Sequence, residues 1–361
     1  MTQLTAILEQ IDHTDPAAYG KTRNFIDGAV TRLSPYISRG VISTRFVMER
    51  LLERGIHPQK MNKLLQELAW RDYFQQVWVH KGEEINSDMK FAQQNVSHRE
   101  MPCAVLDAQT GIEAIDEGIR EFYQTGYMHN HLRMYVASIA CNVGGSYWKT
   151  PARWLYYHLL DADWASNALS WQWVAGTFSS KKYNANQQNI NKYCYSTQKN
   201  TFLDVSYEEL AEMEVPEILQ RTCIPNLVTR LPENTVNEWD PQLPVLLYNF
   251  YNLDPLWKKE TKANRVLLLE PTHFEKYPVS DKTMDFVLEL TRNIEGIQVF
   301  SGEFDDFVQT FHPEKIFFKE HPLNRHYRGT EEPRDWMFDV KGYFPSFFGF
   351  WKKCEKQFPF R

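Results

Sequence analysis

Two stretches of the sequence combine polar and aromatic side chains at the spacing of a helix. Asn130 and Arg133 stand three residues apart, so they share one helix face. Asp163, Asn167 and Trp171 repeat every four residues and form a second such line. Buried polar groups cost free energy unless they are paired. The spacing therefore leaves two interpretations open: a structural hydrogen-bond network between core helices, or a pocket for a large polar, aromatic ligand.

The order of residues in these stretches favours the pocket. Residues 126–134 read Gly-Tyr-Met-His-Asn-His-Leu-Arg-Met, and residues 161–173 read Asp-Ala-Asp-Trp-Ala-Ser-Asn-Ala-Leu-Ser-Trp-Gln-Trp. Both patterns resemble the flavin-binding domain of the DNA photolyase/cryptochrome family. The resemblance implies FAD as the cofactor, held by Asn130, Arg133, Asp161, Asp163 and Asn167. One aspartate then accepts from the ribityl or adenine side of FAD, and the other pairs with Arg133.

The segment 31–34 reads Thr-Arg-Leu-Ser and precedes an expected helix. Thr31 and Ser34 can simply cap that helix, or the helix start can offer free N–H groups to a phosphate. The segment resembles the family pattern Thr-Ser-x-Leu-Ser, which in the family binds the diphosphate of the flavin cofactor. Val30 stands where the family pattern has its first hydroxyl, so one of the implied phosphate contacts is missing, whereas Arg32 occupies the variable position. The cofactor-binding residues implied here are Tyr19, Thr31, Arg32, Leu33 and Ser34.

Residues 66–74 read Gln-Glu-Leu-Ala-Trp-Arg-Asp-Tyr-Phe. Glu67 and Arg71 have the spacing of an intrahelical ion pair, which at a surface contributes little. The resemblance instead implies that Glu67 and Trp70 face a lesion pocket and that Arg71 lies near the flavin. Glu67 is then a candidate carboxyl donor to a thymine carbonyl, and burial against Trp70 would favour its protonated form.

The resemblance also implies a substrate. Met134 matches enzymes that act on cyclobutane pyrimidine dimers, although His131 stands where an Arg is frequent in them. Trp70 and Trp173 would stack on extruded bases, at roughly 1–3 kcal/mol per base. A dimer is easier to extrude than normal bases because its pairing is already impaired. The residues expected at the reacting lesion are Glu67, Trp70, Asn130, Met134 and Trp173.

Electron supply is expected to run through tryptophans. Trp171 and Trp148 hold the first two places of the family's electron-transfer chain, whereas the third place reads Asn95. The side chains that are candidates to replace it are Tyr147, Trp154 and Tyr156.

UV-damaged DNA is the expected partner. Lys181 and Lys182 belong to a solvated loop or hold DNA phosphates, and Arg23 and Trp70 complete the expected DNA-binding residues. The stretch 183–194 loosely resembles the iron–sulfur branch of the family, but a cluster needs four Cys ligands and Cys194 has no near neighbour. We therefore expect no iron–sulfur cluster and no metal.

Composition sets broad limits. The chain has 361 residues, 43% of them hydrophobic, and a net charge of −6, which neither requires nor excludes a nucleic-acid partner. Its five Cys are odd in number and widely spaced, which favours reduced thiols in a cytoplasm over disulfides. We see no signal peptide and no apolar run long enough to cross a membrane. A cytoplasmic monomer is expected.

Periodicity predicts a mainly α protein: an all-helical domain at 1–203, an acidic helix and linker at 204–242, and a smaller α/β domain at 243–361. Apolar runs at 244–248, 265–269, 297–300 and 315–318 alternate with helical patterns, which indicates a parallel, Rossmann-like sheet. This half weakly resembles a shortened antenna domain of the same family, in reversed order, and whether an antenna chromophore binds is open. The basic segment with His321, Arg325, His326 and Arg328 is expected to be a solvated loop, and the alternatives are a nucleic-acid contact or a metal site without clear ligand spacing.

The predicted function is therefore a deoxyribodipyrimidine photolyase, a carbon–carbon lyase that splits the dimer by electron transfer from light-excited reduced FAD. The alternative is a cryptochrome-like blue-light sensor without repair activity, which the reversed domain order and Asn95 favour. A helical DNA-binding module without flavin is hard to reconcile with Asp161, Asp163 and Asn167.

Overall fold

The computed structural model describes residues 2–358, which fold into two compact units. Unit 1 combines residues up to 20, residues 31–80 and residues from 228 onward, and unit 2 combines residues 21–30 with residues 81–227. This division differs from the boundaries predicted at residues 203 and 242. The reason is that helices near the start of the chain pack with elements near its end, and a composition shift along the sequence cannot reveal such pairing.

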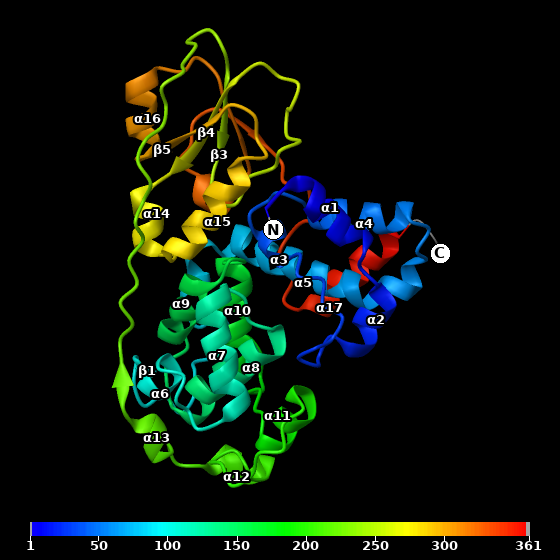
Figure 1. Cartoon of the computed structure of the whole chain (residues 1–361), viewed down its shortest axis with the longest axis vertical. Helices are drawn as coiled ribbons and strands as arrows, with labels where there is room; N and C mark the ends of the chain where they lie inside the picture. Colours follow the sequence, from blue (N-terminus) through cyan, green and yellow to red (C-terminus); the bar gives the residue numbers. More distant parts are fainter. Residues whose placement is uncertain (1, 359–361) are drawn as a thin grey trace. The chain divides into compact units, whose positions relative to one another are not determined.

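Unit 2 is built mainly from helices, of which α7, α8, α9 and α10 pack against one another (Figure 1). A two-stranded antiparallel ribbon pairs β1 (Met101–Pro102) with β2 (Thr222–Cys223). The helices are α6 (Cys103–Leu106), α7 (Glu113–Thr125), α8 (Asn130–Ala137), the π-helix η2 (Ser138–Val143), α9 (Lys149–His158), α10 (Trp164–Ala175), α11 (Gln187–Cys194), α12 (Tyr207–Glu212) and α13 (Glu217–Gln220), with the 3-10 helix η1 (Gly82–Asn86) before them.

Local sequence explains where the central helices of unit 2 begin and end. Asp116 accepts hydrogen bonds from the N–H and hydroxyl of Thr110 at 2.8 and 2.7 Å, which closes the start of α7. α7 ends at Gly126 and α10 at Gly176, both in the left-handed region at φ 70° and 79°, where a side chain would be strained. These caps fix both ends of α7 and the C-terminal end of α10, the helix that carries Asn167.

Unit 1 joins a group of helices to an α/β layer. Pro58 opens the long helix α5, where its missing N–H has no intrahelical partner to lose, and the Ser43 hydroxyl caps α4 by accepting from the N–H of Phe46. Its helices are α1 (Leu4–Asp12), α2 (Pro16–Thr22), α3 (Ser34–Ser38), α4 (Thr44–Glu53), α5 (Pro58–Lys81), α14 (Pro271–Lys276), α15 (Asp281–Thr291), α16 (Phe304–Phe311) and α17 (Phe347–Cys354), with 3-10 turns η3 (Pro322–Asn324) and η4 (Glu355–Gln357).

The sheet of unit 1 confirms the predicted parallel α/β fold. Its strand order is β5-β4-β3-β6-β7, and every pairing is parallel. The central strand is buried along its whole length, as expected for a strand covered on both faces. The strands are β3 (Val245–Tyr248), β4 (Asn264–Leu269), β5 (Ile297–Ser301), β6 (Ile316–Lys319) and β7 (Thr330–Glu332).

The terminal helix α17 starts at Phe347, because Pro345 disfavours helix before it and the Ser346 hydroxyl caps the helix by accepting from Gly349 N–H. One local prediction needs correction. The segment 321–328 is not simply a solvated loop: His321 is buried and stacks on Tyr251, with ring centroids 4.3 Å apart. Among the described residues, no helix is long and apolar enough to span a membrane.

Candidate functional site

The predicted flavin residues of unit 2 are organised around one ion pair. Arg133 on α8 contacts both carboxylate oxygens of Asp161 through Nη2, at 3.1 and 3.0 Å. Its Nε also donates to the Met128 carbonyl at 2.8 Å. The Asp161 side chain is 7% exposed and that of Arg133 21% exposed, so water screens the pair weakly. The predicted pairing of Arg133 with one of the two aspartates is thus made by Asp161.

Asp163 and Asn167 are also held by hydrogen bonds. Asp163 is the N-cap of α10 and accepts from the N–H of Ser166 at 2.7 Å. The Asn167 amide donates to the Ala152 carbonyl on α9 at 2.8 Å. Both side chains are buried. A carboxylate at this helix start also interacts favourably with the positive end of the helix dipole.

Ser166 belongs to this site although sequence reasoning passed over it. Its hydroxyl oxygen is buried and has no hydrogen-bond partner among residues 2–358. Burying a hydroxyl without a partner costs about 1–3 kcal/mol, unless a ligand or a water molecule supplies the missing hydrogen bond. It stands directly before Asn167 and therefore lies off the line formed by Asp163, Asn167 and Trp171. We call the group Arg133, Asp161, Asp163, Ser166 and Asn167 the polar cluster.

The two predicted electron-transfer tryptophans are buried, with Trp148 fully inaccessible and Trp171 2% exposed. The Trp148 indole donates to an Asp88 carboxylate oxygen at 2.9 Å. Tyr147 lies beside it, with ring centroids 5.8 Å apart. Burial raises the pKa of Tyr147 to about 12, and the charge of Asp88 acts in the same direction.

The other two candidates for the third place have different neighbours. The Trp154 indole donates to the Tyr123 hydroxyl at 2.9 Å, and Tyr156 packs edge-on against Trp164. Asn95 itself is exposed, with a left-handed φ of 60°. Tyr147 is therefore a candidate whose ring contacts Trp148 directly.

The predicted lesion and DNA residues of unit 2 are more accessible than the polar cluster. Trp173 is 37% exposed and lies 5.7 Å from the ring of Tyr183. Lys181 is exposed, whereas Lys182 donates to the Gln94 carbonyl at 3.0 Å. Partly or fully accessible side chains complete this set: Arg23, Asn130 and Met134.

In unit 1, Glu67, Trp70 and Arg71 all lie on α5 and are half-buried. The Arg71 guanidinium donates to the Ser38 hydroxyl at 3.0 Å. The Trp70 indole stacks on Phe347 of α17, with ring centroids 3.8 Å apart and planes 10° apart. Sequence reasoning missed Phe347 because its position in the chain is remote from Trp70 and nothing in its local pattern marks it.

The predicted diphosphate segment of unit 1 departs from expectation. α3 has only five residues and begins at Ser34 itself, so Ser34 is not its cap. The residue before it, Leu33, makes no side-chain cap, and the Thr31 hydroxyl accepts from Leu33 N–H at 3.4 Å. Arg32 has a left-handed φ of 51°. Tyr19, the remaining residue of this set, lies half-buried on α2.

The predicted site residues are thus divided between the two units. Those in unit 2 include the whole polar cluster, both tryptophans of the electron path, and the accessible lesion and DNA residues. Those in unit 1 are Tyr19, Thr31, Arg32, Leu33, Ser34, Glu67, Trp70 and Arg71.

The sheet of unit 1 offers a second, smaller candidate site. A cavity of about 20 Å³ lies where strands β3 and β4 end, and its lining includes Asn249, Glu270, His273 and Asn324. The carboxyl ends of parallel strands are where such sheets bind ligands. Burial lowers the pKa of His273 to about 3, so its ring is neutral. The volume admits a water-sized guest rather than a chromophore.

Comparison with known proteins identifies the domain that carries the polar cluster. Residues 64–222 match the family model of the FAD binding domain of DNA photolyase. A deoxyribodipyrimidine photo-lyase of Alkalihalophilus pseudofirmus is 31% identical over 164 residues, which cover 44% of this chain and 34% of that protein. A cryptochrome DASH of Danio rerio is 31% identical over 198 residues, which cover 48% of this chain and 36% of that protein. The chain therefore spans about a third of the length of these relatives.

Solved structures of the same two kinds are similar to this chain. The structure of a cryptochrome from Synechocystis sp. is 26% identical, with a TM-score of 0.46, and the match covers 53% of this chain and 43% of that one. A bacterial class III photolyase from Agrobacterium tumefaciens is 22% identical, with a TM-score of 0.44, covering 58% of this chain and 54% of that one.

Proposed function

We propose that this protein, whose residues 64–222 match the family model of the FAD binding domain of DNA photolyase, is a light-dependent flavoprotein that repairs cyclobutane pyrimidine dimers in DNA. The observation that carries the proposal is the polar cluster. Asp163, Ser166 and Asn167 lie at the start of α10, and the buried hydroxyl of Ser166 has no partner among residues 2–358. A stable helical core has no need of that hydroxyl, whereas a polar cofactor would complete it.

The polar cluster fits FAD by its chemistry. Asn167 and Ser166 offer an amide and a hydroxyl, both suited to a ring edge or a sugar hydroxyl. The ion pair of Arg133 with Asp161 keeps the carboxylate oriented within a largely buried setting. Asp163 braces the first turn of α10 beside them. Arg133, Asp161, Asp163 and Asn167 are held by hydrogen bonds before a ligand arrives, which reduces the entropy lost on binding.

Bound FAD would supply light absorption and one-electron transfer, which side chains cannot provide. The residues of the chain would bind and orient the lesion. Glu67 would donate a proton toward a thymine carbonyl, and Trp70 would offer an aromatic face to an extruded base. Asn130 and Met134 are accessible on α8 and remain proposed lesion contacts.

A blue-light sensor is the second candidate. The observation that favours it is the third place of the electron path, where the exposed Asn95 carries an amide that cannot donate one electron. Curated relatives named cryptochrome DASH match as well as those named photo-lyase. A sensor would keep the polar cluster and the flavin but would not turn over a dimer.

The deciding experiment has two stages. The full chain is first reconstituted with FAD and freed of excess cofactor, and flavin absorbance that stays with the protein is expected. The chemically reduced, loaded protein is then mixed with an oligonucleotide that carries one thymine dimer, in light and in darkness. Dimers are expected to be lost in the light and to stay intact in darkness. A loaded, reduced protein that leaves every dimer intact would exclude repair and favour the sensor, and a protein that retains no flavin would exclude both.

A further inference from the structure

One face of the Trp70 indole is covered by a residue from a distant part of unit 1. Phe347 on α17 lies parallel to it, with centroids 3.8 Å apart and planes differing by 10°. Phe347 is 3% exposed, whereas Trp70 is only half-buried. A base cannot stack on a face that is already occupied at this distance. The face toward Phe347 is therefore closed to a base, and only the rest of the half-buried indole is left to receive one.

We propose that Phe347 is a positioning residue for base recognition, which holds the plane of Trp70 so that its opposite face receives an extruded base. This inference rests on the proposed function, because that function assigns base stacking to Trp70. An indole that is free to change rotamer would lose conformational entropy when a base binds. Because a stacked partner already fixes the rotamer, less entropy is lost on binding. Parallel packing on one face also leaves the other face flat, which is the geometry that a base requires.

The remaining neighbours of Trp70 support the same role. Tyr73 meets the indole edge-on at 5.7 Å, and Phe74 lies at 5.3 Å with planes 41° apart. Tyr73 also packs edge-on against Phe347 at 6.0 Å. These contacts brace the indole from its side and from one face. We call Trp70, Tyr73, Phe74 and Phe347 the aromatic wall.

Phe347 can position Trp70 only if α17 is itself held in place. The Tyr73 hydroxyl donates to the Phe344 carbonyl at 3.1 Å, just before α17. The Ser346 hydroxyl caps the helix, and the inward side chains Phe350 and Trp351 are 2% and 3% exposed. α17 is thus a packed element of unit 1 and not a loose segment.

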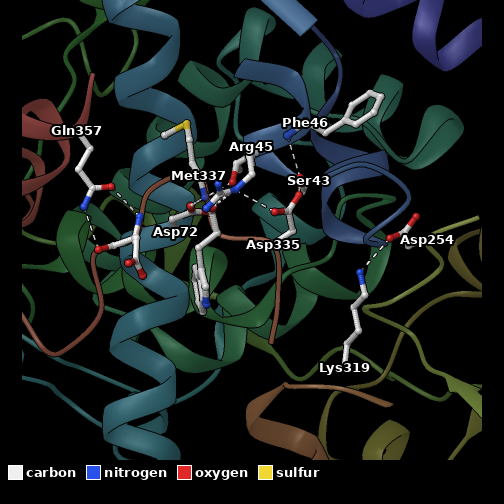
Figure 2. Close-up of polar contacts among 12 residues, drawn as sticks. Ser43, Arg45, Phe46, Asp72, Asp254, Lys319, Asp335, Met337 and Gln357 are labelled. Carbon is white, nitrogen blue, oxygen red and sulfur yellow. Dashed lines mark hydrogen bonds and ion pairs between the residues drawn. The ribbon is translucent and has the colours of Figure 1, made fainter. Parts of the chain in front are cut away.

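A second anchor ties the approach to α17 onto α5. Figure 2 shows Asp72, two residues beyond Trp70, next to Met337. The Met337 N–H donates to an Asp72 carboxylate oxygen at 2.9 Å, and the Thr44 hydroxyl donates to both oxygens at 2.9 and 3.1 Å. The segment that carries Phe347 is therefore fixed to the same helix as Trp70, both before α17 and at its start.

The opposite role, in which Phe347 blocks base stacking, predicts the opposite sign. If α17 occupied the face that a base needs, removing the Phe347 ring would tighten the binding of dimer-bearing DNA. If Phe347 positions Trp70, removing the ring weakens that binding. A single affinity measurement therefore separates the two roles.

The test uses the full chain loaded with FAD, in darkness, with a labelled oligonucleotide that carries one thymine dimer and its undamaged counterpart. Phe347→Leu is expected to weaken dimer binding roughly 2- to 13-fold, which is the strength of an aromatic pair converted at about 1.36 kcal/mol per tenfold. Binding of undamaged DNA should stay unchanged, as should repair per absorbed photon once the dimer is bound. Phe347→Tyr keeps the flat ring and should restore dimer affinity.

Phe350→Leu is the matched control, because Phe350 is equally buried on α17 but its ring neighbours are Tyr73 and Phe344. The inference is overturned if Phe347→Leu tightens the binding of dimer-bearing DNA or leaves it unchanged. It is also overturned if the binding of undamaged DNA weakens equally, or if Phe350→Leu weakens the binding of dimer-bearing DNA to the same extent. Should Phe347→Leu not fold, Phe347→Met carries the same comparison. Trp70→Ala tests the proposed function separately: unchanged dimer affinity there would remove the stacking role of Trp70 itself.

Discussion

The polar cluster on α8 and α10 and the aromatic wall on α5 and α17 hold their side chains by different forces. In the polar cluster, Arg133 and Asp161 meet at 3.0 Å, and Asp163 and Asn167 each have a directional hydrogen bond. In the aromatic wall, rings pack at centroid distances from 3.8 to 6.0 Å. Directional bonds fix where a group points, whereas ring packing fixes a plane.

The difference suggests what each region is suited to do. A cofactor that must stay bound through many light cycles is best served by fixed donors and acceptors, and removing one partner there leaves a buried charge or dipole unpaired. A base that enters and leaves needs a flat surface that any base can use, since stacking tolerates sequence. Substitutions in the two regions should therefore produce different kinds of loss.

The largest effect is expected for Trp171→Phe. Trp171 is buried on the same helix as Asn167 and is the predicted first electron donor. Photoreduction of bound FAD in the presence of a thiol should be abolished or greatly slowed, as followed by transient absorption. Trp164→Phe is the control, because Trp164 is equally buried on α10 and lies outside the predicted path. Repair by chemically reduced protein should survive both changes, and an unaltered photoreduction rate in Trp171→Phe would mean that electrons enter elsewhere.

The next effect concerns the ion pair of the polar cluster. Asp161→Asn leaves the mostly buried Arg133 without its charge partner, which should cost about 3–5 kcal/mol of unfolding free energy, as measured with urea. Replacing the pair together, as Arg133→Met with Asp161→Leu, should recover much of that stability because no charge is left alone. Flavin retention should not recover in the double variant. If it does, the pair supports the fold and not the cofactor.

A smaller effect, and one that depends on pH, is expected beside the aromatic wall. Burial raises the pKa of Asp72 to about 6, against the lowering effect of its bonds from Met337 and Thr44. The folded state thus holds the proton more tightly than the unfolded chain does. The resulting stabilisation is complete below about pH 4 and is lost as pH rises through 6, on the order of 2–3 kcal/mol.

The Asp72→Asn variant has no carboxyl group to titrate at this position. It therefore serves as the reference for the wild-type chain. The stability of the wild-type chain relative to Asp72→Asn should therefore fall between pH 4 and 6 and stay level above 7. Urea unfolding at a series of pH values measures this difference. A constant difference across that range would show that Asp72 does not bind its proton more tightly in the folded protein.

The smallest effect is expected for Ser166→Ala. Without flavin, removal of a buried hydroxyl that lacks a partner among the described residues should leave the unfolding free energy unchanged or slightly higher. With flavin, loss of one hydrogen bond should weaken retention by about 0.5–1.5 kcal/mol. Titration of FAD into the two proteins gives the second value. Equal affinity would place the Ser166 hydroxyl outside the cofactor contacts.

Much of this architecture follows from neighbours along the chain. The strands at 245–248 and 264–269 were predicted nearly to the residue, because a buried parallel strand is a short continuous apolar run. Asp163 caps α10 because its carboxylate needs to reach only three residues along the chain. Local patterns also placed Asn130 and Arg133 on one helix, since a single period of the helix sets their spacing.

Only the tertiary structure decided how distant segments meet. No sequence period distinguishes Asp161 from Asp163 as the partner of Arg133, because the choice depends on how the loop before α10 packs on α8. Likewise, nothing in the sequence around Phe347 indicates that its ring will lie on Trp70, or that residues from 228 onward share a compact unit with residues 31–80. Such contacts form where burial of apolar surface outweighs the entropy of closing a long loop, and that balance depends on the whole chain at once.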